Sequence, residues 1–160
     1  MGNMVLDSIF SPSLIIASME SEEKEEAFEE LIDLFVSKFP SVSRADALRV
    51  VRERESKQTT GVKPGIAVPH ARLSSISSAK GIIGISKAGI DYDAMDGQPV
   101  HVIFLLFSTH DDYSTQLRSL RTLSVLLDDP AFYTALMSAK DADSIYNTIC
   151  KFEDILTTSM

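Results

Sequence analysis

The apolar residues in the first third of the chain recur at helical spacing in two stretches. Ser21 is a candidate N-cap, and the glutamates after it suit the positive end of a helix dipole. The stripe that follows predicts one buried helix face, made of Ala27, Phe28, Leu31, Leu34, Phe35 and Phe39. Ser43 with Asp46 resembles a capping box, which predicts a second helix. The inward positions of this second helix are Ala47, Val50 and Val51.

The last third of the chain has the same helical period. Its first stripe consists of Leu117, Leu120, Leu123 or Ser124, and Leu127. Asp129 followed by Pro130 is typical of the cap and first position of a short helix. Asp141 or Asp143 then begins a last helix, whose stripe is Ile145, Ile149, Phe152 and Leu156.

Strand-like segments lie between these helices. Residues 81–85 form one, and residues 100–107 are apolar nearly throughout, as in a central strand covered on both faces. Val62 and residues 66–68 are also strand-like, whereas residues 91–99 contain turn formers and predict a loop. Helices and strands do not alternate strictly. The pattern therefore predicts an α/β fold, a single-domain sandwich over residues 1–160 with a mixed β-sheet flanked by helices.

Composition excludes several classes of protein. The net charge is −8, from 23 acidic and 15 basic side chains, which argues against nucleic acid as a partner. No apolar stretch approaches the length of a membrane span, so direct membrane insertion is not expected, and no secretory signal is visible. Cys150 is the single cysteine and fits a reducing cytoplasm. We therefore expect a cytoplasmic location.

The most informative local feature runs from Thr59 to Arg72 and places a histidine directly after a proline. Pro69 fixes its own φ and favours extended backbone before it, which stiffens the approach to His70. Gly61 and Gly65 permit sharp turns or close approach of the backbone. Neutral imidazole is a nucleophile near pH 7, so the pattern indicates a positioned reagent.

The run from Gly61 to His70, Gly-Val-Lys-Pro-Gly-Ile-Ala-Val-Pro-His, resembles the signature of the fructose/mannitol-type enzyme IIA domain of the bacterial phosphotransferase system. That family includes free-standing, nitrogen-regulatory IIA proteins. Residues 52–55, 90–100, 105–107 and 116–120 extend the resemblance in the family's order over most of the chain. The resemblance implies that His70 accepts a phosphoryl group from an HPr-like phosphocarrier protein. It would then pass the group to a IIB component or hold it as a regulatory signal.

The resemblance also assigns residues around His70. Arg54 matches the family's arginine, and its planar guanidinium suits phosphate geometry. Gly61 and Gly65 would let backbone amides approach the phosphate, while Lys63 and Arg72 bracket the motif with positive charge. No cofactor is expected, because the chain has no Walker-type glycine loop and the phosphoryl donor would be a protein. Three scattered histidines give no metal signature.

The chain departs from the family pattern at two positions. Pro64 stands where members commonly have asparagine, which removes one backbone amide and one side-chain donor. Gln116 aligns with a second histidine that many members carry in the later helix. Glutamine still donates a hydrogen bond but cannot become positively charged. Phosphoryl transfer would therefore be slower, or the phosphohistidine would be stabilised differently.

Each assignment has a plainer alternative. His70 could be a strand-end histidine bonded to a carbonyl, and Arg54 a solvated arginine paired with Asp46, Glu53 or Glu55. His101 falls in a strand-like run and His110 in a loop, so neither is expected to act. For the whole protein, the rival to a phosphocarrier is a regulatory binding module of the same fold. Such a module would control transporters, kinases or transcription regulators with little phosphoryl transfer. The sequence leaves open whether the chain is an enzyme in the strict sense.

Overall fold

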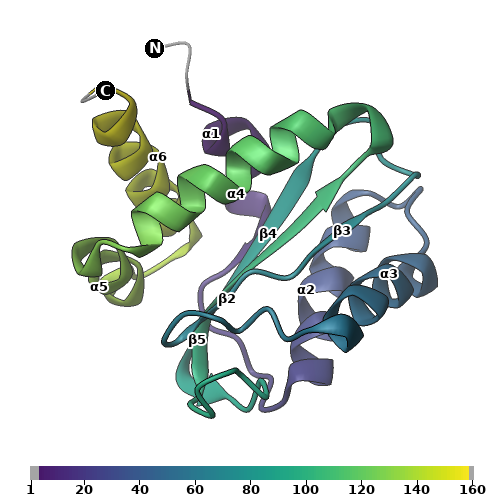
Figure 1. Cartoon of the computed structure of the whole chain (residues 1–160), viewed down its shortest axis with the longest axis horizontal. Coiled ribbons are helices and arrows are strands. Elements are labelled where there is room, and N and C mark those ends of the chain that lie inside the picture. Colours follow the sequence, from purple (N-terminus) through teal and green to yellow (C-terminus); the bar gives the residue numbers. More distant parts are fainter. Residues whose placement is uncertain (1–3, 159–160) are drawn as a thin grey trace.

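A five-stranded mixed sheet lies at the centre of the computed structural model (Figure 1), which describes residues 4–158. The remaining residues of the predicted domain, 1–3 and 159–160, lie outside this range. The strand order is β1-β4-β5-β2, and β3 also pairs with β5. Only β4 and β5 are antiparallel. The strands are β1 (Ile15–Ile16), β2 (Ile66–Ala67), β3 (His70–Arg72), β4 (Lys80–Ile90) and β5 (Val100–Ser108).

Helices cover both faces of the sheet. Helices α2 and α3 pack against one face, and α1, α4, α5 and α6 pack against the other (Figure 1). This arrangement confirms the predicted α/β sandwich with a mixed sheet. The helical elements are α1 (Leu6–Ile9), η1 (Pro12–Leu14), α2 (Lys24–Lys38), α3 (Arg44–Lys57), η2 (His110–Asp112), α4 (Tyr113–Leu127), α5 (Pro130–Ser138) and α6 (Ala142–Thr158). None of the helices described over residues 4–158 has the length and apolarity needed to cross a membrane.

Strand β5 is the central strand that its apolar run predicted. Successive side chains of a strand point to opposite faces, so both faces of β5 are apolar. Ile103, Leu105 and Phe107 belong to the core beneath α2 and α3. Val102, Phe104 and Leu106 belong to the core on the other face. Because β2 and β3 both pair with β5, this strand fixes the position of the predicted motif.

Three of the four predicted helix caps are confirmed. The Ser43 hydroxyl accepts from the amide of Asp46, Asp129 accepts from that of Ala131, and Asp141 accepts from that of Ser144. The cap predicted at Ser21 is wrong. Helix α2 begins later, and Glu23 and Glu26 form its capping box. A carboxylate accepts the amide bonds that a serine hydroxyl would accept, so several polar residues in a row leave the cap ambiguous.

The predicted stripe of α4 is displaced around the helix. Leu123 and Leu127 are buried, but Leu117 and Leu120 are only partly buried and Ser124 is exposed. The inward face also contains Gln116, Ser119 and Leu126. A polar residue replaces an apolar one at this face because the first turns of α4 lie beside a cavity rather than over the closed core. Val62, predicted as strand-like, is outside the strands and 54% exposed.

Candidate functional site

His70 is the first residue of β3, an edge segment of the sheet. Its Cα is in register with Leu106 of β5, and the Pro69 carbonyl accepts from the Leu106 amide at 2.9 Å. Pro69 has no N–H of its own, so it suits the end of a short edge segment. The side chain of His70 is half-buried. The backbone around the histidine is therefore fixed by the central strand, as the rigid Pro-His pair predicted.

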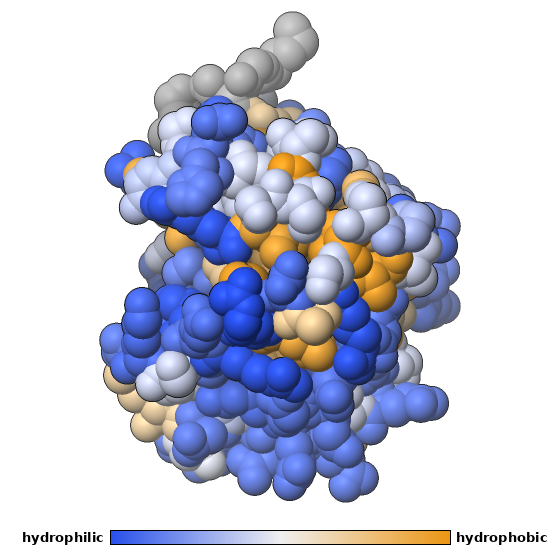
Figure 2. All heavy atoms as spheres, turned by 90° about the vertical axis from the view of Figure 1, so that its right-hand side faces the viewer, coloured by the Kyte–Doolittle hydropathy of each residue, from blue (hydrophilic) through white to orange (hydrophobic). Residues whose placement is uncertain are grey.

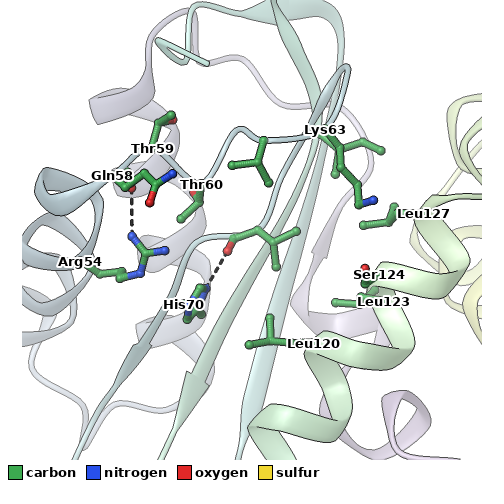
Figure 3. A pocket seen from close by; sticks show the side chains of 13 residues that line it. Arg54, Gln58, Thr59, Thr60, Lys63, His70, Leu120, Leu123, Ser124 and Leu127 are labelled. Atoms are coloured by element: carbon green, nitrogen blue, oxygen red, sulfur yellow. Dashed lines mark hydrogen bonds between the residues drawn. The ribbon is translucent and has the colours of Figure 1, made fainter. Parts of the chain in front are cut away.

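One ring nitrogen of His70 has a hydrogen-bond partner, and among residues 4–158 the other has none. The Nδ1 atom lies 2.9 Å from the Val68 carbonyl oxygen (Figure 3). A carbonyl oxygen only accepts, so Nδ1 must carry the hydrogen in this bond. In neutral imidazole the lone pair then lies on Nε2. The plainer alternative, a histidine bonded to a carbonyl, is thus observed, and it prepares Nε2 as a nucleophile.

The surroundings of His70 favour the neutral ring. Burial lowers the pKa of His70 below its ordinary value, and the positive charge of Arg54 lowers it further. The bond to the Val68 carbonyl and the charge of Glu55 oppose this shift without cancelling it. The lowered pKa favours the neutral ring, whose Nε2 lone pair is available to an electrophile.

Two cavities meet at His70 and Arg54, which line both. The first, here the apolar cavity, has a volume of about 260 Å³ and lies between the Gln58–Lys63 loop and α4 (Figure 3). Its apolar wall includes Ile66, Val68, Leu120, Leu123 and Leu127. The second, here the polar cavity, has a volume of about 400 Å³. It is lined by Val50, Glu53, Arg54, Lys57, His70, Ala71, Arg72 and Gln116.

Arg54 is the arginine of α3 that has no carboxylate partner. Its guanidinium donates to the Gln58 carbonyl at 2.9 Å, beyond the end of the helix. Arg44, Arg49 and Arg52, on the same helix, each form an ion pair with an acidic residue. Within residues 4–158, no acidic group lies within ion-pair distance of Arg54. The predicted alternative, pairing with Asp46, Glu53 or Glu55, is therefore not observed, and the charge of Arg54 remains available to an anion.

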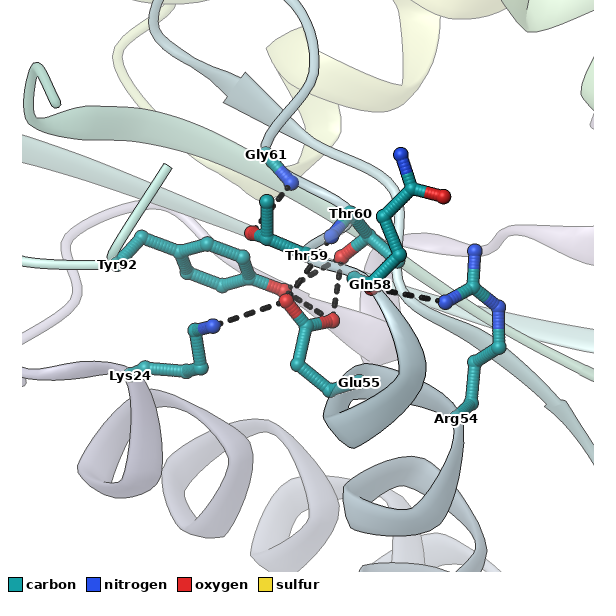
Figure 4. A network of polar contacts seen from close by, with 8 residues as sticks. All are labelled: Lys24, Arg54, Glu55, Gln58, Thr59, Thr60, Gly61 and Tyr92. Carbon is teal, nitrogen blue, oxygen red and sulfur yellow. Dashed lines mark hydrogen bonds and ion pairs between the residues drawn. The ribbon is translucent and has the colours of Figure 1, made fainter. Parts of the chain in front are cut away.

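A buried polar network supports the loop between Arg54 and His70 (Figure 4). Glu55, which is 8% exposed, accepts from the Thr60 amide at 2.9 Å and from the Thr60 hydroxyl at 2.7 Å. Lys24 pairs with the same carboxylate at 3.0 Å, and the Tyr92 hydroxyl lies 2.8 Å from that of Thr60. Burial alone would raise the pKa of Glu55, but the bonds from Thr60 and Lys24 outweigh it and the pKa is lowered. Sequence reasoning missed this network.

The network continues to the histidine through the backbone. The Thr60 carbonyl accepts from the Val68 amide at 3.1 Å, and the Val68 carbonyl accepts from His70 Nδ1. Glu55 therefore fixes Thr60, Thr60 fixes Val68, and Val68 orients the imidazole ring. Glu55 is a positioning residue for His70 in this geometry.

We expect Glu55→Gln to lower the free energy of unfolding at pH 7 by about 2 kcal/mol, because charged hydrogen bonds in a buried site are lost. The pKa of Glu55 is lowered in the folded state, so its contribution is present above the unfolded pKa. The contribution disappears as the pH falls through the folded value. Urea unfolding at pH 7 and at acidic pH measures both. Glu53→Gln, which removes an exposed pair with Arg49, is the matched control and should change stability by less than about 1 kcal/mol. Equal effects of the two substitutions would contradict the role given to the network.

The structure does not bring the motif glycines to the cavities. A Cβ on Gly61 would lie 2.9 Å from that of Ala94, and its amide already donates to the Thr59 hydroxyl. Gly65 has a φ of +76° and follows Pro64 in a turn that the Ile66 amide closes onto the Lys63 carbonyl. Proline and glycine at the centre of such a turn form a type II geometry. Pro64 also lines neither cavity, so packing and turn formation account for these three residues.

Gln116 does reach the site. It is 7% exposed and lines the polar cavity with His70 and Arg54, although it lies on α4. Arg72 lines the same cavity, and Lys63 lines the apolar one, where it pairs with Asp128 at 2.6 Å. Sequence reasoning also missed Lys57, whose place in the last turn of α3 puts it on the polar cavity. The structure thus brings His70, Arg54 and Gln116 together.

The other two histidines line neither cavity. His101 Nδ1 lies 2.8 Å from the Ser86 carbonyl, as expected of a strand histidine with a partner. His110 is exposed, and its Nδ1 lies 3.3 Å from the Arg72 guanidinium. Among residues 4–158, no cluster of three or more histidine, cysteine or acidic side chains has the arrangement of a metal site.

The site opens onto a partly apolar surface. Figure 2 shows apolar side chains gathered between two hydrophilic regions on the face that carries α3 and β3. The cavity that His70 lines also has an apolar wall. A nucleophile beside an apolar patch with hydrophilic borders suits contact with another macromolecule, because such a patch can be desolvated while its borders fix orientation.

Comparisons with known proteins identify the family of the chain. Residues 8–151 match the family described as phosphoenolpyruvate-dependent sugar phosphotransferase system, EIIA 2. The chain is 32% identical over 146 residues to the PTS system fructose-specific EIIABC component of Bacillus subtilis. That match covers 91% of this chain but 23% of the relative.

Solved structures give the same result. The nitrogen regulatory protein IIA-Ntr of Neisseria meningitidis has a TM-score of 0.84 and 27% identity, covering 91% of this chain and 99% of that one. IIA mannitol in its complex with phosphorylated IIB mannitol, from Escherichia coli, has a TM-score of 0.73. Its identity is 15%, covering 89% of this chain and 97% of that one, so it supports the fold alone. The chain belongs to the EIIA 2 family of the phosphoenolpyruvate-dependent sugar phosphotransferase system.

Proposed function

We propose that this protein is a phosphocarrier that accepts a phosphoryl group on Nε2 of His70 from an HPr-like protein. It passes the group to a IIB component or holds it as a regulatory signal. The observation that carries the proposal is the tautomer of His70. Nδ1 donates to the Val68 carbonyl, which leaves Nε2 for the cavities that Arg54 also lines. We propose a cytoplasmic location for this exchange, with a single IIA domain as the acting unit.

The chemistry follows from these groups. Nε2 attacks phosphorus in line, so that an N–P bond forms as the bond from phosphorus to the donor's leaving atom breaks. The proton of Nδ1 stays on the ring, where the Val68 carbonyl stabilises the positive charge that develops on the imidazole. Arg54 stabilises the negative charge on the equatorial oxygens. No base is needed, because the attacking nitrogen carries no proton.

The partner surface includes the apolar cavity and its rim. A protein donor must bring its phosphoryl group to His70, and the wall made by Leu120, Leu123 and Leu127 lines the same cavity as that residue. The IIA mannitol structure was solved in complex with phosphorylated IIB mannitol, and its fold is similar to this one. We propose that an HPr-like donor and a IIB-like acceptor occupy this surface in turn, since both must reach one nitrogen.

The proposal is tested by incubating the protein with enzyme I, HPr and phosphoenolpyruvate and measuring its intact mass. We expect one added phosphoryl group, stable to base and lost in acid, as for a phosphohistidine. Peptide mapping at neutral pH should place it on His70. Omitting HPr is the control, and no addition in the complete mixture would reject the proposed function.

The neutral Gln116 gives a further prediction. Gln116→His should speed phosphoryl transfer about fivefold at pH values where the new ring is protonated, because a charged donor binds the phosphoryl oxygens about 1 kcal/mol more strongly. The pH–rate profile should gain an inflection near the ordinary pKa of histidine, about 6.5. Rapid-quench assays between about pH 5 and 8 measure the transfer rate and its pH dependence. Gln98→His, in the exposed loop before β5, is the control. A profile unchanged by Gln116→His would show that residue 116 does not reach the phosphoryl group.

A further inference from the structure

A second guanidinium lines the polar cavity beside His70. Arg72 lies two residues after His70 in β3, and side chains at such positions point to the same face of a strand. Their Cα atoms are separated by about 7 Å along the strand. The long arginine side chain spans that distance easily. Arg72 therefore lines the polar cavity from β3, whereas Arg54 lines it from α3.

Arg72 is held in place without being neutralised. The carbon of its guanidinium lies 4.8 Å from the ring centroid of Tyr113, and one nitrogen lies 3.3 Å from Nδ1 of His110. Both partners are uncharged in this geometry, because a histidine nitrogen that accepts from an arginine has no hydrogen. In the part of the chain that the structure describes, no carboxylate forms an ion pair with Arg72. The ring and the imidazole thus limit its rotamers and leave its charge free.

The wall of the polar cavity carries more positive than negative side chains. Glu53 is the single carboxylate on its wall, and it pairs with Arg49 at 3.2 Å. Gln116, on the opposite element, contributes a neutral amide. A phosphoryl group on His70 would bring about two negative charges into this space. Arg54 compensates about half of that charge, and Lys57 and Arg72 are the other cations on the cavity wall.

We propose that Arg72 is a second phosphate-binding residue, whose guanidinium contacts an oxygen of the phosphoryl group on His70. Tyr113 and His110 act as positioning residues that present this guanidinium to the cavity. The inference rests on the proposed function of His70. Arg72 supplies the positive charge that Gln116 cannot provide. This role explains how an acceptor site works with a neutral residue at position 116.

The test compares Arg72→Gln, Arg72→Lys and Tyr113→Leu with Arg44→Gln, a control at the far end of α3. Phosphoryl transfer from phospho-HPr should be slowed about tenfold by Arg72→Gln and less by Arg72→Lys, because lysine keeps the charge but loses the fork. Tyr113→Leu keeps the charge of Arg72 but removes the ring that supports its guanidinium. The transfer rate of this variant should therefore fall between those of Arg72→Gln and Arg72→Lys. Arg44→Gln should transfer at the rate of the unchanged protein.

A second readout separates contact with phosphate from other effects. The phosphoprotein is isolated and the ³¹P resonance of its phosphohistidine is titrated with pH. A neighbouring cation lowers the pKa of the phosphoryl group, so Arg72→Gln should raise that pKa while Arg72→Lys keeps it low. Slower transfer with an unchanged ³¹P titration would assign Arg72 to partner docking and overturn the proposal. Unchanged values of both would also overturn it. Failure of the unchanged protein to accept phosphate would remove the proposed function together with this inference.

Discussion

His70→Ala will abolish acceptance of the phosphoryl group and leave the fold intact. The substitution removes Nε2, the ring nitrogen that is left with a lone pair, and neither cavity is lined by another histidine. The structural cost is small, because one hydrogen bond to the Val68 carbonyl is lost from a half-buried position. We expect a loss of about 1 kcal/mol in the free energy of unfolding. Intact mass after incubation with phospho-HPr, together with urea unfolding, measures both effects.

The matched control is His101→Gln, which alters a histidine that also bonds to a carbonyl but lies away from the site. This variant should accept phosphate as the unchanged protein does. An acid-labile phosphate on His70→Ala would identify a different nucleophile and reject the assignment. A pH series adds a second check. The pKa of His70 is lowered, so acceptance should persist as the pH falls through about 6.5 and decline only below that value.

The parts of the fold that sequence predicted are those set by local chemistry. The caps at Ser43, Asp129 and Asp141 depend on residues within one turn, and the central strand depends on a nearly unbroken apolar run. These signals do not require knowledge of what packs against them. The cap at Ser21 was predicted wrongly because neighbouring glutamates compete for the same amide groups.

The site was predictable where the motif is contiguous and not where distant elements meet. His70 and Arg54 could be selected because they lie in or near one recognisable run. The Glu55 network depends on Lys24 and Tyr92, which α2 and the loop after β4 bring together. No periodicity in the sequence indicates that meeting. The support of Arg72 by Tyr113 is of the same kind, because it depends on how α4 crosses the end of β3.

Gly61 and Gly65 show how little the residue type alone says about the role of a glycine. Gly61 and Gly65 were expected to bring amides to a phosphate, since glycine permits close approach. In the structure both glycines have packing and turn roles, and their contact with a phosphate stays a prediction. Gly61 fits against Ala94, and Gly65 has a positive φ next to the Tyr133 hydroxyl. A glycine has several physical uses, and sequence alone does not select among them.

Arg54→Ala will slow phosphorylation of His70 by about 100-fold, and Arg54→Lys will slow it less. Alanine removes both the charge and the planar fork, whereas lysine keeps the charge alone. Arg52→Ala is the matched control, because Arg52 lies two residues earlier on α3 and pairs with Glu25. Rapid-quench transfer assays with phospho-HPr measure the rates. Wild-type rates for both Arg54 variants would return this residue to a role on the solvated helix surface.

A titration separates the electrostatic part of this effect from any change in docking. The charge of Arg54 contributes to the lowered pKa of His70, so Arg54→Ala should raise that pKa and Arg54→Lys should change it little. The NMR titration of the His70 ring measures this in the free protein, with no partner present. A raised pKa together with slower transfer would show that Arg54 acts on the histidine and its phosphoryl group directly. Slower transfer with an unchanged pKa would contradict the electrostatic role and assign Arg54 to binding the donor protein.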